Sequence, residues 1–155
     1  MPDYKEIMKE IDMQEQELVF GSFTYDDAFR LGTLLYMKAK ARELPIAIDI
    51  TRNGQQLFHA ALPGSSPDND QWIIRKSRVV NRFGRSSFYV ANQLADEGTT
   101  IEERYHVSPM EFSPNGGSFP ITIKDVGTIG TITVSGLPQE EDHRFVTETI
   151  REFLK

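Results

Sequence analysis

The sequence predicts an α+β domain in which helices cover an antiparallel sheet. Two pairs of strand-like segments, each joined by a short turn, predict the sheet, and segments with apolar residues at three- and four-residue spacings predict the helices. The chain has 155 residues, without an internal repeat or a linker long enough to divide it. We therefore expect a single domain, residues 1–155.

The N-terminal part predicts two helices. Residues 3–17 carry one apolar stripe, and their opposite face is acidic. Thr24 is a good N-cap for a second helix, which starts near Tyr25 and ends before Pro45 with a basic last turn. The aromatic segment 18–23, between the two helices, has the composition of one short strand.

Two hairpins follow from alternation and turn chemistry. Asn53-Gly54 separates the alternating segments 46–51 and 56–61, and this dipeptide is a strong hairpin signal. The segments 119–124 and 128–135 are rich in Ile, Thr and Val and are joined by a tight turn. Together with the short strand near the N-terminus, they predict a sheet of about five strands.

Three further helices are predicted from their own start or stop signals. They span about 71–83, after the loop 63–70 and before Gly84; about 87–97, behind Ser86 and Ser87; and the segment from Pro138 to the end. The stretch from Gly98 to Pro114 is polar and is predicted to be irregular.

Composition excludes several classes of protein. The absence of cysteine excludes disulfide frameworks, thiolate zinc sites and iron–sulfur clusters. A net charge of −6 argues against nonspecific binding to nucleic acid or to a membrane surface. No apolar run approaches the roughly 18 residues of a spanning helix, and the N-terminus lacks signal-peptide features. We expect a cytoplasmic protein with no nucleic-acid and no membrane partner.

Catalytic and metal motifs are missing as well. The three histidines are widely separated, so no paired metal-ligand motif exists and no metal site is expected. The phosphate-binding GxxxxGK, the dinucleotide-binding GxGxxG and the hydrolase GxSxG patterns do not occur. Whether the protein is an enzyme stays open.

Lys76 is the most informative single position. At 100° per residue it falls inside the apolar arc of the third helix, beside a basic stripe that includes Arg75. Burying an ammonium is costly unless it is paired or reaches solvent. Two explanations follow: the lysine forms a salt bridge with one of the 23 acids, or Arg75 and Lys76 project into a pocket and hold a carboxylate or phosphate.

Two further features have both a structural and a functional interpretation. The glycines of Gly116-Gly117-Ser118 either form a tight turn or let free amides and the serine hydroxyl bind an anion. His143 lies on the inner face of the last helix and is either a hydrogen-bonded structural residue or a ligand or acid–base group. His59 and His106 are interpreted as a structural residue and a solvated loop residue.

Several segments together resemble one family. They are Trp72 to Lys76, Ser86-Ser87, Gly116 to Ile121, and Val126 to Pro138 followed by Glu141-Asp142-His143. The chain resembles the UPF0303 family, which is related to the HbpS- and GlcG-type haem-degrading-domain proteins. The resemblance implies a profilin-like α-β-α sandwich, assembly into a homo-oligomer, and haem as a cofactor of related members. The motif residues that it carries over are Arg75, Lys76, Ser86, Ser87, Gly116, Gly117, Ser118, Pro120, Asp142 and His143.

Two hypotheses follow. In the first, the protein is an oligomeric binding protein for a small anionic ligand, with haem suggested by the resemblance and His143 or His106 as its axial donor. Asn115 departs from the family pattern, which places a histidine there. In the second, the protein is a noncatalytic adaptor or scaffold whose interfaces are Ile74 and the segment 18–23. The ligand-binding residues of the first hypothesis are Arg75, Lys76, Ser86, Ser87, Gly116, Gly117, Ser118 and His143.

Overall fold

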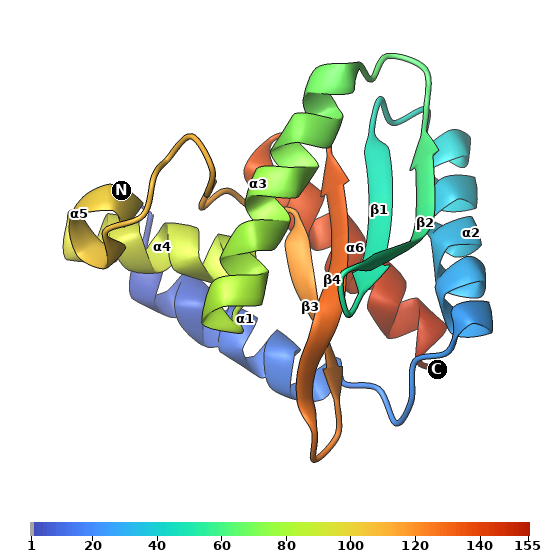
Figure 1. Ribbon diagram of the computed structural model, residues 1–155, viewed down its shortest axis with the longest axis horizontal. Coiled ribbons are helices and arrows are strands. Elements are labelled where there is room, and N and C mark those ends of the chain that lie inside the picture. The colour runs from blue at the N-terminus through green and yellow to red at the C-terminus, as the bar shows by residue number, and fades with distance from the viewer. Residues whose placement is uncertain (1) are drawn as a thin grey trace.

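The computed structural model describes residues 2–155 and contains six helices and four strands in this part of the chain (Figure 1). The helices are α1 (Tyr4–Glu17), α2 (Tyr25–Ala41), α3 (Pro67–Phe83), α4 (Ser87–Glu97), α5 (Ile101–Tyr105) and α6 (Gln139–Phe153). The strands are β1 (Ala47–Arg52), β2 (Gln55–Ala61), β3 (Ser118–Ile123) and β4 (Gly127–Ser135). This confirms the α+β class.

The four strands form one antiparallel sheet in the order β2-β1-β4-β3. Both predicted hairpins, β1–β2 and β3–β4, are confirmed, and β1 pairs with β4 to join them. Asn53 and Gly54 adopt positive φ angles of 51° and 79° in the first turn, as a type I′ turn requires.

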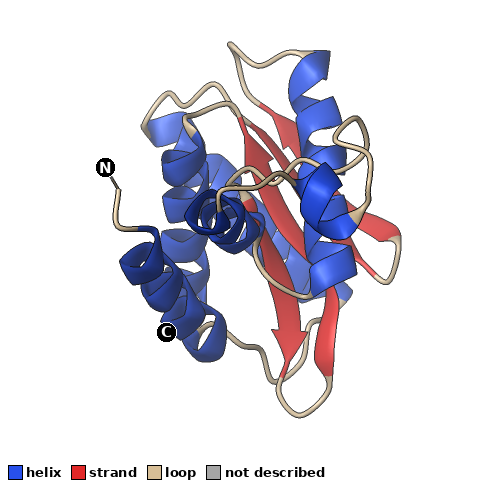
Figure 2. Cartoon of the chain, turned by 90° about the vertical axis from the view of Figure 1, so that its left-hand side faces the viewer, coloured by secondary structure: helices blue, strands red, loops and turns tan. Residues whose placement is uncertain are grey.

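Helices cover both faces of the sheet (Figure 2). On one face α2 and α6 pack against alternating aliphatic side chains of the strands, because successive residues of a strand point to opposite faces. The strand residues of this apolar core are Ile48, Ile50, Phe119, Ile121, Ile132 and Val134.

The other face of the sheet, under α3, is polar although it is buried. Thr131, Thr133 and Ser135 alternate with the aliphatic residues of β4, and Asp49 and Ser118 occupy the same face of β1 and β3. Lys76 of α3 is buried above this face. Buried polar groups need partners, so this layer is a candidate location for a functional site.

The structure corrects three sequence predictions. The segment 18–23 is not a strand: only Phe20 forms an isolated bridge to β3, and the aromatic side chains belong to the core. The sheet therefore has four strands in the described residues rather than about five. Helix α3 begins at Pro67, earlier than predicted, because Ser66 and Asn69 form a capping box and proline suits the first turn. The stretch predicted to be irregular contains the short helix α5.

Candidate functional site

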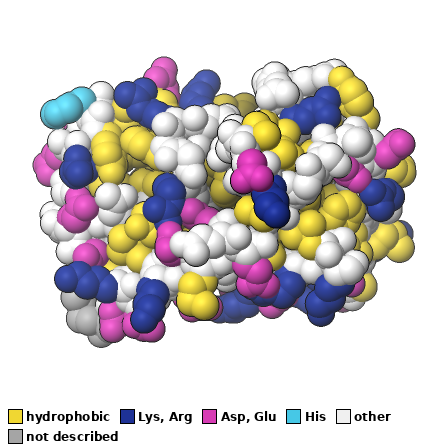
Figure 3. Space-filling model, turned by 90° about the horizontal axis from the view of Figure 1, so that it is seen from below, with side chains coloured by type: hydrophobic (Ala, Val, Ile, Leu, Met, Phe, Trp, Pro, Cys, Tyr) yellow, Lys and Arg dark blue, Asp and Glu magenta, His cyan; other side chains and the backbone are white. Residues whose placement is uncertain are grey.

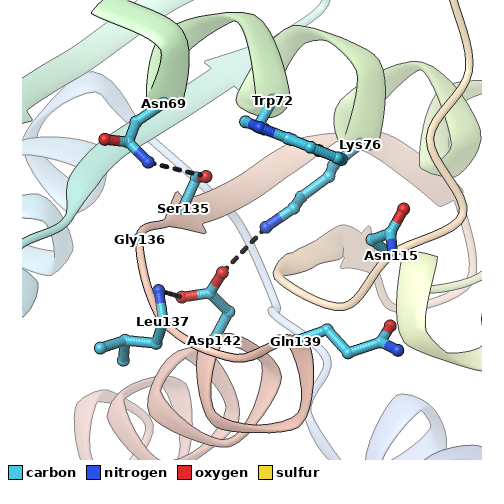
Figure 4. A pocket seen from close by; sticks show the side chains of 9 residues that line it. All are labelled: Asn69, Trp72, Lys76, Asn115, Ser135, Gly136, Leu137, Gln139 and Asp142. Atoms are coloured by element: carbon cyan, nitrogen blue, oxygen red, sulfur yellow. Dashed lines mark hydrogen bonds and ion pairs between the residues drawn. The ribbon is translucent and has the colours of Figure 1, made fainter. Parts of the chain in front are cut away.

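A polar cavity of about 280 Å³ lies between α3, the end of β4 and the start of α6 (Figure 4). Its walls come from three segments, residues 69–76, 115 and 135–142, that are far apart in the sequence and that the fold brings together. The lining residues are Asn69, Trp72, Lys76, Asn115, Ser135, Gly136, Leu137, Gln139 and Asp142.

The charged pair Lys76–Asp142 forms the floor of this cavity. Lys76 Nζ lies 2.9 Å from Asp142 Oδ2, and the side chains are only 5% and 1% exposed. Burial lowers the pKa of Lys76, and the nearby carboxylate opposes this change. Burial also raises the pKa of Asp142, to about 6, although Lys76 pulls it down. The buried lysine thus combines both interpretations: it is in a salt bridge, and it faces a cavity.

The lysine ammonium retains one hydrogen-bond donor for an occupant of the cavity. Besides Asp142 it donates to the backbone oxygen of Val134 at 3.2 Å, and an ammonium has three N–H groups. Among residues 2–155 no third acceptor hydrogen-bonds it. Asp142 accepts a bond at each oxygen, from Lys76 at Oδ2 and from the backbone N–H of Leu137 at Oδ1, 3.1 Å away, and the lysine compensates its charge.

Three amide side chains in the wall have their oxygens occupied elsewhere. A backbone N–H can only donate, so an amide that pairs with it must turn its oxygen toward it and keep its NH₂ group free. The pairs with a backbone N–H are Ser66 to Asn69 Oδ1 at 2.9 Å and Gly116 to Gln139 Oε1 at 3.0 Å. Asn115 Oδ1 accepts instead from the Ser113 hydroxyl at 2.6 Å. Only Asn69 uses its NH₂ group further, in a long bond of 3.4 Å to Ser135 Oγ. The cavity therefore presents donors rather than acceptors.

The glycine loop supports the lysine and does not line the cavity. Gly117 has a φ of 137°, and a Cβ atom there would lie 2.8 Å from Lys76 Nζ and 2.5 Å from the Val134 oxygen. Only glycine combines this backbone conformation with this close approach. Gly116 acts through its backbone N–H, which orients Gln139.

The predicted serines hold the neighbouring loops together. Ser86 caps α4 by accepting from the backbone N–H of Tyr89, and Ser87 Oγ accepts from the backbone N–H of Ser118 at 3.0 Å. The Ser118 hydroxyl is 2.8 Å from that of Thr133. All three predicted serines are buried, so their polar atoms serve the fold around the site.

Arg75 and His143 lie outside this cavity. The Arg75 guanidinium stacks on the Trp72 ring at 4.6 Å. His143 points into a separate cavity of about 190 Å³ beside α1, where its Nε2 is 2.7 Å from Gln14 Oε1 and its Nδ1 is buried without a partner in residues 2–155. Burial lowers the pKa of His143 to about 4, so the imidazole is neutral at pH 7.

Sequence reasoning missed Asn69, Trp72, Ser135 and Gln139. Asn69 and Trp72 precede Lys76 by seven and four residues, a spacing that places all three on one side of a helix. That signal was present in the sequence, but the predicted start at residue 71 left Asn69 outside the helix. Ser135 and Gln139 carry no such local signal, because the sheet and α6 bring them to the cavity.

The fold places the protein in the class of α+β domains with a four-stranded antiparallel sheet and a polar cavity where α3 meets α6. Residues 23–151 match the family described as haem degrading protein HbpS-like. The chain is 55% identical over 145 residues to a UPF0303 protein of Streptomyces coelicolor, with 94% of this chain and 92% of the relative covered. A UPF0303 protein of Edwardsiella ictaluri is 45% identical over 150 residues, which is 97% and 96% of the two chains. The chain belongs to the UPF0303 family, with an HbpS-like domain.

Solved structures share the fold. The crystal structure of the Ybr137w protein matches with a TM-score of 0.88 at 37% identity, covering 94% of this chain and 87% of that one. HbpS matches with a TM-score of 0.66 at 18% identity, covering 85% and 89%. The PduOC:heme complex matches with a TM-score of 0.68 at 15% identity, covering 84% and 94%. The last two likenesses are likenesses of fold.

The residues around the Lys76 cavity do not fit a haem group, and neither His143 nor His106 is placed to serve as its axial donor there. Haem iron in proteins is held by His, Cys, Met or Tyr, and none of the nine residues around the Lys76 cavity is of these types. Neither nitrogen of His143 is open to a ligand, because Nε2 hydrogen-bonds Gln14 and Nδ1 is buried. His106 is exposed at the end of α5. We therefore assign no residue a role toward haem.

None of the helices in residues 2–155 is both long and apolar enough to cross a membrane. In the same residues, no group of three or more His, Cys, Asp or Glu side chains is arranged to hold a metal ion.

Proposed function

We propose that the protein binds a small molecule through a carboxylate group, in the cavity above the Lys76–Asp142 pair. The observation that carries this proposal is that the free polar groups of the wall are hydrogen-bond donors. The free polar ends are the third N–H of Lys76 and the NH₂ groups of Asn115 and Gln139, while the charge of Asp142 is compensated by Lys76. A wall of donors matches an occupant that offers acceptors, and a carboxylate offers the strongest ones.

The start of α6 adds to this preference. Gln139 is the first residue of α6, so the positive end of the helix dipole faces the cavity. Trp72 and Leu137 provide apolar surface for the remainder of the ligand. Since Asp142 already neutralises Lys76, recognition depends on hydrogen bonds more than on net charge, and the ligand we propose is a monocarboxylate rather than a polyphosphate.

Isothermal titration with small monocarboxylates, and with their primary amides and primary alcohols, tests the proposal. We expect saturable binding of a carboxylate, and weaker binding of the matched amide and of the matched alcohol. Because the cavity holds about 280 Å³, the series begins with the smallest acids and extends to aromatic ones.

A charge substitution in the wall provides the matched control. Asn115→Asp keeps the shape and the bond from Ser113 but replaces the free NH₂ group with an anionic oxygen, so carboxylate binding should weaken at least tenfold. Asn81→Asp adds the same charge at an exposed position of α3 away from the cavity and should leave binding unchanged. Equal binding by the two variants, or preference for the alcohol over the carboxylate, would overturn the proposal.

We also propose that the chain forms a homo-oligomer through the outer face of α2. Tyr25, Phe29 and Met37 of this helix are 60%, 64% and 57% exposed, an unusual exposure for large apolar residues. Figure 3 shows a face of the molecule on which charged side chains of both signs are mixed with apolar ones. Light scattering after size exclusion should give a multiple of 17.7 kDa that Phe29→Glu reduces. A monomeric wild-type protein would refute this assembly.

The adaptor hypothesis keeps only part of its basis. Ile74 is 42% exposed, as that hypothesis requires. Leu18, Phe20 and Phe23 are at most 5% exposed and belong to the core, so the segment 18–23 does not offer its large apolar side chains to a partner. The carboxylate-binding function is therefore the one that we favour.

A further inference from the structure

A second cavity, of about 300 Å³, lies between β2 and the first half of α3. It is lined by Asp49, Gln56, His59, Asp70, Ile73 and Ile74, and none of these residues lines the Lys76 cavity. The two cavities use different sides of α3, and the proposed carboxylate site does not account for this one.

A β-bulge builds the sheet side of the second cavity. The register between β1 and β2 pairs Ile50 with Phe58 and then Thr51 with Gln56, so Leu57 is the extra residue. Gln56 and His59 would point to opposite faces of a regular strand, and the bulge turns both toward α3. Asp49 pairs directly with His59 and lies on that face too.

Asp49 is a buried carboxylate without a cation. The residue is only 6% exposed, and its two oxygens accept from neutral groups, Thr51 Oγ1 at 2.6 Å and Gln56 Nε2 at 2.6 Å. In residues 2–155 no Lys, Arg or His nitrogen forms an ion pair with it. A carboxylate has about four acceptor positions, so capacity for further donors remains. Burial of an unpaired charge is costly, which makes this a place where a cation would be stabilised.

The histidine opposite Asp49 does not neutralise it. His59 Nε2 is 2.7 Å from Asp70 Oδ1 of α3, so the ring is directed away from β1 and toward the rim. The cavity thus has a buried negative charge at its base and a second carboxylate at its edge. Ile73 and Ile74 form an apolar wall between them, and the latter is a large aliphatic residue that is 42% exposed.

We propose that this second cavity binds a small aliphatic primary amine in its ammonium form. The ammonium group donates to Asp49 at the base, and the alkyl chain lies along Ile73 and Ile74. Because the charged base of the cavity lies beside an apolar wall, the cavity favours an ammonium group on an alkyl chain over a bare metal ion. This proposal is independent of the carboxylate site and goes beyond it.

Titration with n-alkylammonium ions of two to six carbons, and with the alcohols of the same lengths, tests the proposal by calorimetry or by chemical-shift changes at Asp49 and Ile74. We expect saturable binding that strengthens with chain length, and at least tenfold weaker binding of the alcohols. Absence of saturable binding, or equal binding of amine and alcohol, would contradict the proposal. Binding of sodium or magnesium ions as tight as that of the amines would also contradict it.

Two variants and one control separate the contributions of charge and wall. Asp49→Asn keeps the shape and should weaken amine binding at least tenfold, whereas Asp68→Asn, at an exposed acid in the first turn of α3, should leave it unchanged. If Asp49→Asn does not fold, Ile74→Ala still tests the site, because it should remove the dependence on chain length. Asn115→Asp should not affect amine binding, so failure of the carboxylate site and failure of this one are distinguishable.

Discussion

Lys76 of α3 and Asp142 of α6 form a buried ion pair that joins the two helical layers at the end of the sheet. Their charged atoms are 2.9 Å apart although 66 residues separate them in the sequence. The lysine reaches its partner at the C-terminal end of β4, where it also donates to the Val134 oxygen. The pair therefore connects the position of α3 to the start of α6, and this connection has measurable consequences.

Removing either partner of the pair should destabilise the protein strongly. Lys76→Met or Asp142→Leu leaves one buried charge without its partner, which costs about 3–5 kcal/mol of unfolding free energy. The double variant removes both charges, so its loss should be well below the sum of the two single losses. Urea unfolding measures all three; additive losses would contradict the coupling.

Gly117 should not tolerate a side chain. Gly117→Ala adds a methyl group 2.8 Å from Lys76 Nζ and places alanine at a φ of 137°, so we expect a loss of about 3 kcal/mol or more. Gly127→Ala is the matched control, because its φ is 121° but nothing lies within 4 Å of the new atom. The control should lose only the backbone part, about 1–3 kcal/mol. Equal losses in thermal or urea unfolding would argue against crowding at the lysine.

His143 should make the protein less stable in acid. Burial lowers its pKa from 6.5 to about 4, so the unfolded chain binds the proton more readily and stability is lost as the pH falls through 6.5 toward 4. The full effect is about 3 kcal/mol, at 1.36 kcal/mol per pKa unit. His143→Phe, which places a ring beside Phe88 and Phe119, should remove this loss. Urea unfolding at pH 7 and pH 4.5 tests this, and an unchanged pH dependence in the variant would exclude the histidine as its source.

Protonation of Asp142 should change the stability of the protein in the opposite direction. Its pKa is raised from 3.8 to about 6, so here the folded protein binds the proton more readily and stability increases as the pH falls from 6 toward 3.8. The wild-type protein should therefore show a shallow dependence on pH in this range. Asp142→Asn should become less stable in acid, and His143→Phe more stable. Slopes of the same sign in the two variants would contradict this assignment.

The parts of the fold that depend on local chemistry were predictable. Asn53-Gly54 forms its turn, Thr24 caps α2 in a capping box, and Gly84 ends α3 in a left-handed conformation, because in each case the neighbouring backbone alone sets the requirement. The aromatic segment 18–23 was wrongly predicted to be a strand, because the residues that favour strands are also those that favour burial in a core. Helix α5 has five residues, too few to show a period.

Within the site, only the burial of Lys76 was predictable from the sequence. The helical angle of Lys76 was enough to predict its burial, because burial on a helix follows from position along the chain. Its partner Asp142 could be identified only as one of many acids, since the pairing depends on how α6 packs. The same holds for His143: the sequence places it on the inner face of α6, but the direction toward α1 and Gln14 is a tertiary property.

The polar layer under α3 also affects how the protein fluctuates. Helices α2 and α6 are held by closely packed aliphatic side chains, whereas the first half of α3 rests largely on hydroxyl groups, a carboxylate and a buried amine. Such contacts can be exchanged for water at little net cost, so this half-helix should detach from the sheet at a lower free energy than the opposite layer. In deuterated water its amides should exchange earlier than those of α2 and α6. An occupant of either cavity would then slow that exchange by holding the helix in place.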